Sequence, residues 1–102
     1  MHLEDLTEPY LAKPGVTWGR MFSTTGLSVR GKIFAVENHA GNLMVKVPAS
    51  RADELEDSGD ATRMVMRGRA MREWVEMPPE RGEAAWTALL AEAYAYLDEI
   101  TP

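Results

Sequence analysis

The last third of the chain has the clearest pattern of hydrophobic and polar positions. Between about residue 80 and residue 100, apolar side chains recur at intervals of three and four residues, the spacing that places them along one face of an α-helix. The members of this stripe are Trp86, Leu89, Leu90, Ala93, Leu97 and Ile100. The sequence therefore predicts one long C-terminal helix whose apolar stripe covers a sheet.

Before this helix the pattern changes to short runs of β-branched and aromatic residues separated by turn signals, which is typical of strands. The predicted strands lie in the stretches 16–22, 26–36, 42–47, 62–66 and 72–77. In the third of these stretches, Leu43, Val45 and Val47 alternate with Met44 and Lys46, so one face is apolar. In the last pair, the segment RGRAM (67–71) is predicted to join the two strands.

A hairpin is predicted where Arg30 and Gly31 separate two apolar runs. A two-residue loop at this point would pair Val29 with Lys32 and Leu27 with Phe34. That register would place four apolar side chains on one face of the sheet: Leu27, Val29, Phe34 and Val36.

Two short helices are predicted at the edges of the sheet. Thr7 can cap the first, and Pro14-Gly15 ends it. Pro48 opens the second, with Ser50 and Asp53 as a capping pair and Gly59 as a left-handed stop. Together these elements predict a single α+β domain over residues 1–102. It would consist of an antiparallel sheet of about five strands, the long helix packed on one face, and short helices at the edges.

Composition limits the functional classes. A length of 102 residues fits one domain. The sequence has no cysteine, which excludes disulfides and thiolate metal sites and is compatible with a reducing compartment. No apolar run approaches the length of a membrane span, and the first residues carry acids where a signal peptide needs basic ones. We therefore expect a cytoplasmic protein with no membrane association.

Positive charge is concentrated in one segment although the formal net charge is -5. Four arginines fall within ten residues, and two lysines precede them: Arg63, Arg67, Arg69, Arg72, Lys32 and Lys46. Arginine forks suit phosphate oxygens and carboxylates alike. Three interpretations stay open: a strand connection with a structural role, contact with nucleic-acid phosphates, and contact with an acidic protein.

Two further groups of residues are candidates for a partner or self-association surface. Four small residues lie opposite the apolar stripe of the long helix: Ala84, Ala88, Ala91 and Ala95. They favour either a solvent-facing surface or close approach of a second helix or a second copy of the chain. Met64 and Met66 are the other candidates, because methionine both fills cores and lines adaptable binding surfaces.

Catalytic patterns are poor. His2 lies near the N-terminus and His39 in a polar turn, and no cysteine or spaced ligand accompanies them. No nucleophile with a neighbouring base is visible. We therefore predict no catalytic, cofactor-binding or metal-binding residues, no cofactor and no enzymatic activity. A small-molecule pocket under Trp18 and Trp74 is the remaining enzymatic hypothesis.

Three segments carry a family resemblance: GVTWGRMFSTTGLSVRGKIFAV, LMVKVPASRADELEDSG and RGRAMREW. In this order and spacing the chain resembles the N-terminal domain of the TfoX/Sxy competence-regulator family, including its small stand-alone members, from about Val16 to Leu97. Ser23 stands where the family often has glycine, and Ala70 where it often has proline. Both differences fall at predicted turns, so they concern local geometry.

The resemblance implies an order of strand, hairpin, helix, hairpin and C-terminal helix. In full-length members a second, helical domain follows, and the role in competence gene expression is attached to the pair, so we do not carry that role over. We expect a non-enzymatic regulatory or protein-interaction module with an unidentified protein partner or a second copy as its ligand. The alternative is weak, backbone-directed nucleic-acid binding through the arginine-rich strand connection.

Overall fold

The computed structural model describes residues 1–21 and 24–102. Phe22, at the end of the first predicted strand, and Ser23, one of the two departures from the family pattern, lie outside the described residues. Within the described part the strands are β1 (Val16–Met21), β2 (Thr24–Val29), β3 (Lys32–Glu37), β4 (Leu43–Lys46), β5 (Thr62–Met66) and β6 (Arg69–Met77). The helices are η1 (Leu3–Leu6), α1 (Glu8–Leu11), α2 (Ala49–Ser58), η2 (Pro79–Arg81) and α3 (Glu83–Ile100), where η denotes a 3₁₀-helix.

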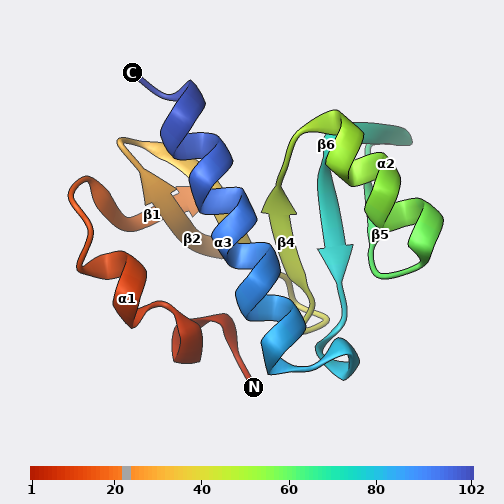
Figure 1. The fold of residues 1–102 in the computed structure, drawn as a ribbon, viewed down its shortest axis with the longest axis horizontal. Coiled ribbons are helices and arrows are strands. Elements are labelled where there is room, and N and C mark those ends of the chain that lie inside the picture. Colours follow the sequence, from red (N-terminus) through yellow and green to blue (C-terminus); the bar gives the residue numbers. More distant parts are fainter. Residues whose placement is uncertain (22–23) are drawn as a thin grey trace.

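The predicted α+β class is confirmed. The strands described form one antiparallel sheet in the order β1-β2-β3-β4-β6-β5. The sheet has six strands within the described residues, where the sequence predicted about five, and the predicted hairpin in the stretch 26–36 supplies two of them. Figure 1 shows α3 crossing one face of this sheet, with α1 on one side of it and α2 on the other.

The core lies between the sheet and α3. Trp86, Leu89, Leu90, Ala93 and Leu97 are all buried, as predicted for the apolar stripe. The prediction for Ile100 is wrong, since this side chain is 48% exposed. Ile100 is the last residue of α3, and the C-terminal end of this helix extends past the strands that it crosses (Figure 1). The helix also begins at Glu83 rather than near residue 80, because η2 and Gly82 precede it.

The register of the β2–β3 hairpin is only partly as predicted. Val29 pairs with Lys32, but Leu27 pairs with Ala35 rather than Phe34, because an irregularity lies between Leu27 and Ser28. The extra residue changes which side chains share a face. Ala35 joins the core under α3, whereas Val36 pairs with Met44 on the opposite face.

The turn of the β2–β3 hairpin is tied to the C-terminal end of the chain. The Arg30 guanidinium donates hydrogen bonds to the Asp98 carboxylate at 2.9 Å and to the backbone oxygens of Asp98 and Thr101, both at 2.8 Å. A fourth bond runs from Nε to the Pro102 oxygen at 3.1 Å. The end of α3 is therefore held against the turn through one arginine.

Both short helices are present. Gly59 ends α2 in the left-handed conformation, with φ of 78°, as predicted. The predicted capping pair is not formed, because α2 begins at Ala49 and Ser50 already lies inside it. Thr7 precedes α1, but its hydroxyl donates to the Glu4 oxygen instead of capping the helix. Among the helices described, none combines the length and apolarity of a membrane span.

Candidate interaction site at the β5–β6 hairpin

The β5–β6 hairpin closes through a two-residue turn, Arg67-Gly68. The predicted connection RGRAM is thus too long, because Arg69, Ala70 and Met71 belong to β6 and Met66 pairs with Arg69. Both turn residues have positive φ, 52° at Arg67 and 78° at Gly68, as in the type I′ turns that suit hairpins. Glycine adopts this conformation freely, but at Arg67 it costs about 1 kcal/mol.

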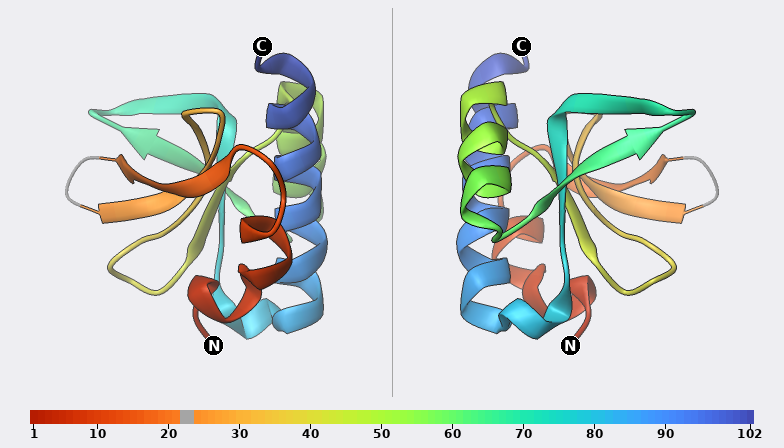
Figure 2. Two further views of the ribbon diagram at one scale, coloured as in Figure 1. Left: turned by 90° about the vertical axis from the view of Figure 1, so that its left-hand side faces the viewer. Right: turned by 90° about the vertical axis from the view of Figure 1, so that its right-hand side faces the viewer.

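The hairpin bends between its base and its end. Arg63 pairs with Val75 near the base and Val65 pairs with Ala70 near the end. The single residue Met64 therefore stands opposite the four residues 71–74 of β6. Figure 2 shows that, past this bend, the hairpin end projects away from the helix layer. It is thus presented beyond the body of the domain.

The end of the β5–β6 hairpin carries a surface hollow. This hollow, of about 510 Å³, is lined by Met66, Arg67, Arg69, Ala70, Met71 and Arg72. Methionine and alanine side chains supply an apolar lining, and the arginines supply positive charge at its border. Val65, on the same hairpin, is 67% exposed. An apolar surface and cationic groups therefore occur side by side at the hairpin end.

Arg63 does not share this environment. Its side chain is 14% exposed and bonds through Nη2 to the Asp53 carboxylate, with Glu56 at 3.6 Å. Both acids come from α2, and Arg63 Nε is buried without a partner among the described residues. Arg63 therefore fixes β5 to α2. Two acids of α2 thus compensate the charge of Arg63.

The two lysines also lie apart from the hollow. Lys46 Nζ is 3.8 Å from a Glu73 oxygen. The other Glu73 oxygen accepts a hydrogen bond from the Tyr96 hydroxyl, and this bond raises the pKa of Tyr96. Lys32 is exposed at the start of β3 and does not line the hollow. Of the six predicted cationic residues, the structure thus brings together Arg67, Arg69 and Arg72.

These three arginines have no ion-pair partner within residues 1–21 and 24–102. Nor does any side-chain hydrogen bond of the described part involve them. Three guanidinium groups with free donors around one apolar hollow are chemically suited to carboxylates or phosphates attached to an apolar body.

Of the other candidate surface residues, all but one are accessible in the structure. Ala84, Ala88, Ala91 and Ala95 are exposed along α3. Met66 is half-buried and lines the hollow, whereas Met64 is 7% exposed at the bend. Met64 is therefore removed from the candidate surface, since a buried side chain offers no contact area to a partner.

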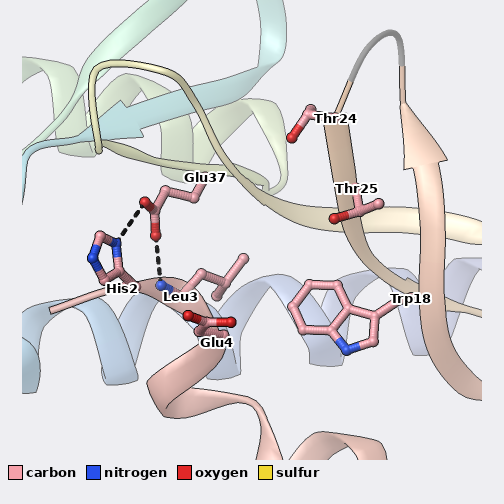
Figure 3. Close-up of a pocket in the computed structure, with 7 residues that line it drawn as sticks. All are labelled: His2, Leu3, Glu4, Trp18, Thr24, Thr25 and Glu37. Atoms are coloured by element: carbon pink, nitrogen blue, oxygen red, sulfur yellow. Dashed lines mark hydrogen bonds and ion pairs between the residues drawn. The ribbon is translucent and has the colours of Figure 1, made fainter.

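A second concavity, of about 220 Å³, lies near the N-terminus (Figure 3). Trp18 lines it, but Trp74 does not, so this concavity is not the expected pocket under both tryptophans. Glu37 accepts a hydrogen bond from the Leu3 N–H at 2.7 Å and contacts His2 Nδ1 at 2.9 Å. The bond to Glu37 raises the pKa of His2. Both oxygens of this carboxylate thus hold the N-terminal segment.

Metal chemistry has no candidate in the structure as described. Within residues 1–21 and 24–102, no group of three or more histidine, cysteine, aspartate or glutamate side chains is arranged to hold an ion. His39 is exposed in the turn between β3 and β4.

Sequence reasoning missed the roles of two residues, one at the site and one at the β2–β3 turn. Val65 was not among the candidate surface residues, yet it is 67% exposed. Arg30 was assigned only to a turn, although its guanidinium binds residues near position 100. The repeated Arg-Gly pair at 30–31 and 67–68 was a visible signal that both turns would have the same two-residue form.

Comparison with known families gives one match. A family model described as the TfoX N-terminal domain matches residues 10–96. No curated protein and no solved structure showed a match to the chain. The matched range includes every described strand and most of α3, so the β5–β6 hairpin belongs to the matched domain.

Proposed function

Because the chain belongs to the TfoX N-terminal domain family, we propose that it is a regulatory domain that performs no catalysis and acts by binding a partner protein. The binding element in this proposal is the end of the β5–β6 hairpin. One observation carries it: three arginines without a carboxylate partner in the described part border an apolar hollow. We also propose a cytoplasmic location, which the lack of cysteine supports.

The composition of the hairpin end supports a protein as the ligand. Arginine, methionine and aromatic residues are enriched at protein interfaces, whereas lysine and glutamate are depleted. The hollow combines two methionines with three arginines, and Val65 adds exposed apolar area on the same hairpin. A partner that covers this area would remove apolar surface from water and supply acceptors for the guanidinium groups at once.

Nucleic-acid binding is the second candidate, and the three free guanidinium groups favour it. The remaining charges favour it less. Arg63 is already paired with acids of α2, Lys46 lies near Glu73, and Lys32 is outside the hollow. A duplex would find few phosphate contacts beyond the hairpin end. A backbone-directed contact of this size would be weak and would fall steeply with salt.

The non-enzymatic part of the proposal rests on the N-terminal concavity. Its acid, Glu37, accepts a hydrogen bond from the Leu3 N–H and contacts the His2 ring, so it binds both the backbone and a side chain of the N-terminal segment. A catalytic base needs a nucleophile or substrate proton within hydrogen-bond reach. Thr24 and Thr25 line the same concavity, but neither is bonded to His2. The arrangement is thus suited to anchoring the first helix.

Site-specific photo-crosslinking in cells of the source organism tests the proposal. A crosslinking amino acid replaces Val65 in one variant and Thr87, exposed on α3, in the control. We expect a protein adduct from position 65 that is absent from position 87 and is suppressed by excess unlabelled domain. Adducts that nuclease treatment removes would favour the nucleic-acid candidate. Equal adducts from both positions, or none, would reject the hairpin as a binding element.

A further inference from the structure

We propose that the hollow of the β5–β6 hairpin binds an acidic, apolar segment of a partner protein: a large aliphatic or aromatic side chain flanked by aspartate or glutamate. This inference rests on the proposed function and names the chemistry of the partner. The segment would place its apolar side chain between the methionines and its carboxylates on the arginines.

The lining sets the apolar half of the ligand. Met66 and Met71 are flexible and polarisable, so they adapt to side chains of different shape. Ala70, with its short side chain, lines the same hollow. A ligand made only of charged groups would leave this apolar surface in contact with water. The hollow therefore favours a ligand with an apolar body.

The border sets the charged half. Arg67, Arg69 and Arg72 lie within six residues, and none has an acidic neighbour bonded to it within the described part. Arginine binds carboxylates in a bidentate geometry, which adds specificity to attraction. Two or three carboxylates spaced along a short segment would match the three guanidinium groups.

The backbone conformation of Arg67 also supports a contact with a partner. Its φ of 52° is a conformation in which asparagine or glycine would be less strained. Strained residues persist where the surroundings or the function require them. No side-chain hydrogen bond or ion pair within the described residues involves Arg67. A contact between the Arg67 guanidinium and a partner would be a functional reason for an arginine at this strained position.

The negative charge of α2, near the base of the hairpin, limits the length of an anionic ligand. α2 carries Asp53, Glu54, Glu56 and Asp57, and Arg63 compensates two of them. A long polyanion that passed from the hairpin end toward α2 would meet these acids. A short acidic segment confined to the end avoids them. The observed charges thus favour a peptide segment over a duplex.

Selection from a library of random twelve-residue peptides displayed on phage tests the inference. The purified domain and its Arg67→Ser/Arg69→Ser variant are used as baits in parallel. We expect sequences that pair a large apolar residue with neighbouring acids to be enriched on the unchanged domain alone. Sequences without this pairing, sequences enriched equally on both baits, or no enrichment would overturn the inference.

An enriched peptide is then synthesised and its affinity measured by fluorescence anisotropy at two salt concentrations. We expect the double variant to raise Kd about tenfold, as loss of two partly exposed ion pairs implies. Lys32→Ser, outside the hollow, serves as the matched control and should leave Kd unchanged. A short DNA duplex that bound more tightly than the peptide would also overturn the inference.

The two levels of the hypothesis can fail separately. If peptides of another composition are enriched, depend on Arg67 and Arg69, and compete with the protein adduct at position 65, the hairpin is a binding element and only the ligand class is wrong. If position 65 gives no adduct in cells, the proposed function itself fails.

Discussion

The two Arg-Gly turns of this domain share their sequence and their backbone conformation but differ in what surrounds them. At the β2–β3 turn, φ is 47° at Arg30 and 86° at Gly31; at the β5–β6 turn, the values are 52° and 78°. Each arginine therefore carries a similar local cost. The Arg30 side chain makes four hydrogen bonds to the C-terminal end of the chain, and the Arg67 side chain makes none within the described residues.

The same turn sequence can therefore serve the stability of the fold at one place and remain available for binding at another. At Arg30 the strain is offset by bonds to residues about seventy positions away. At Arg67 nothing in the described chain offsets it. The β2–β3 hairpin also ends in Glu37, which holds the N-terminal segment, so this hairpin fastens both chain ends. The β5–β6 hairpin fastens its base through Arg63 and leaves its end available.

The largest expected effect on the free energy of unfolding is in the β2–β3 hairpin. A Cβ on Gly26 would approach the Ala35 oxygen to 2.6 Å and Val36 Cγ2 to 2.7 Å. Because the oxygen belongs to the backbone, Gly26→Ala should lower the free energy of unfolding by about 3 kcal/mol in urea denaturation. Gly19→Ala is the matched control, because the atom nearest to a Cβ at Gly19 would be the side-chain end of Ile33, Cδ1, at 3.0 Å. An equal loss in both variants would contradict this explanation.

The same substitution at the two turns should have opposite effects. Arg30→Asn relieves backbone strain but removes the bonds to Asp98, Thr101 and Pro102. We expect a net loss of about 1 to 2 kcal/mol in the free energy of unfolding, because charged hydrogen bonds outweigh the relieved strain even when partly exposed. Urea denaturation measures the change. No loss would mean that the contact with the C-terminal residues contributes nothing to stability.

Arg67→Asn should instead raise the free energy of unfolding, by about 0.5 to 1 kcal/mol. Asparagine tolerates positive φ, and Asn-Gly is the preferred pair in this kind of turn. The variant should also weaken the protein adduct at position 65. If stability falls, the Arg67 side chain makes a contact within the chain after all, and the contrast between the two turns is lost.

The smallest expected effect is a pH dependence at the other end of the β2–β3 hairpin. Glu37 raises the pKa of His2, so protonated His2 stabilises the fold. This contribution is present below the ordinary histidine pKa of about 6.5 and is lost as pH rises through the higher folded-state pKa. Thermal unfolding of the domain and of His2→Gln should therefore differ at low pH and converge at high pH. A constant difference would argue against the ion pair.

Local pattern was enough for the elements of the fold. The spacing of Trp86, Leu90 and Leu97 predicted α3 and its buried face, and the alternation of Leu43, Val45 and Val47 predicted β4. The irregularity after Leu27 was not predictable, because a shift of one residue in register depends on packing across the sheet. Ile100 has the right spacing for the core, yet spacing does not say where the sheet ends.

The site was predicted less well for a physical reason. Sequence grouped the arginines by proximity along the chain, but a side chain is neutralised by whatever the fold places beside it. Arg63 is only four residues before Arg67 and still meets α2, whereas Arg67 and Arg69 lie past the bend and Arg72 lies in it, and all three line the hollow. Which charges remain available is therefore a tertiary property.

The bend in β6 also divides the sheet into parts with different exchange behaviour. β4 pairs with β6 from Glu73 to Met77, and Met71 and Arg72 lie beyond that pairing, opposite Met64. Opening of the hairpin end can therefore proceed without separating β4 from β6. Amide protons of residues 65–72 should exchange with deuterium through local opening, while those of residues 74–77 wait for unfolding of the whole domain.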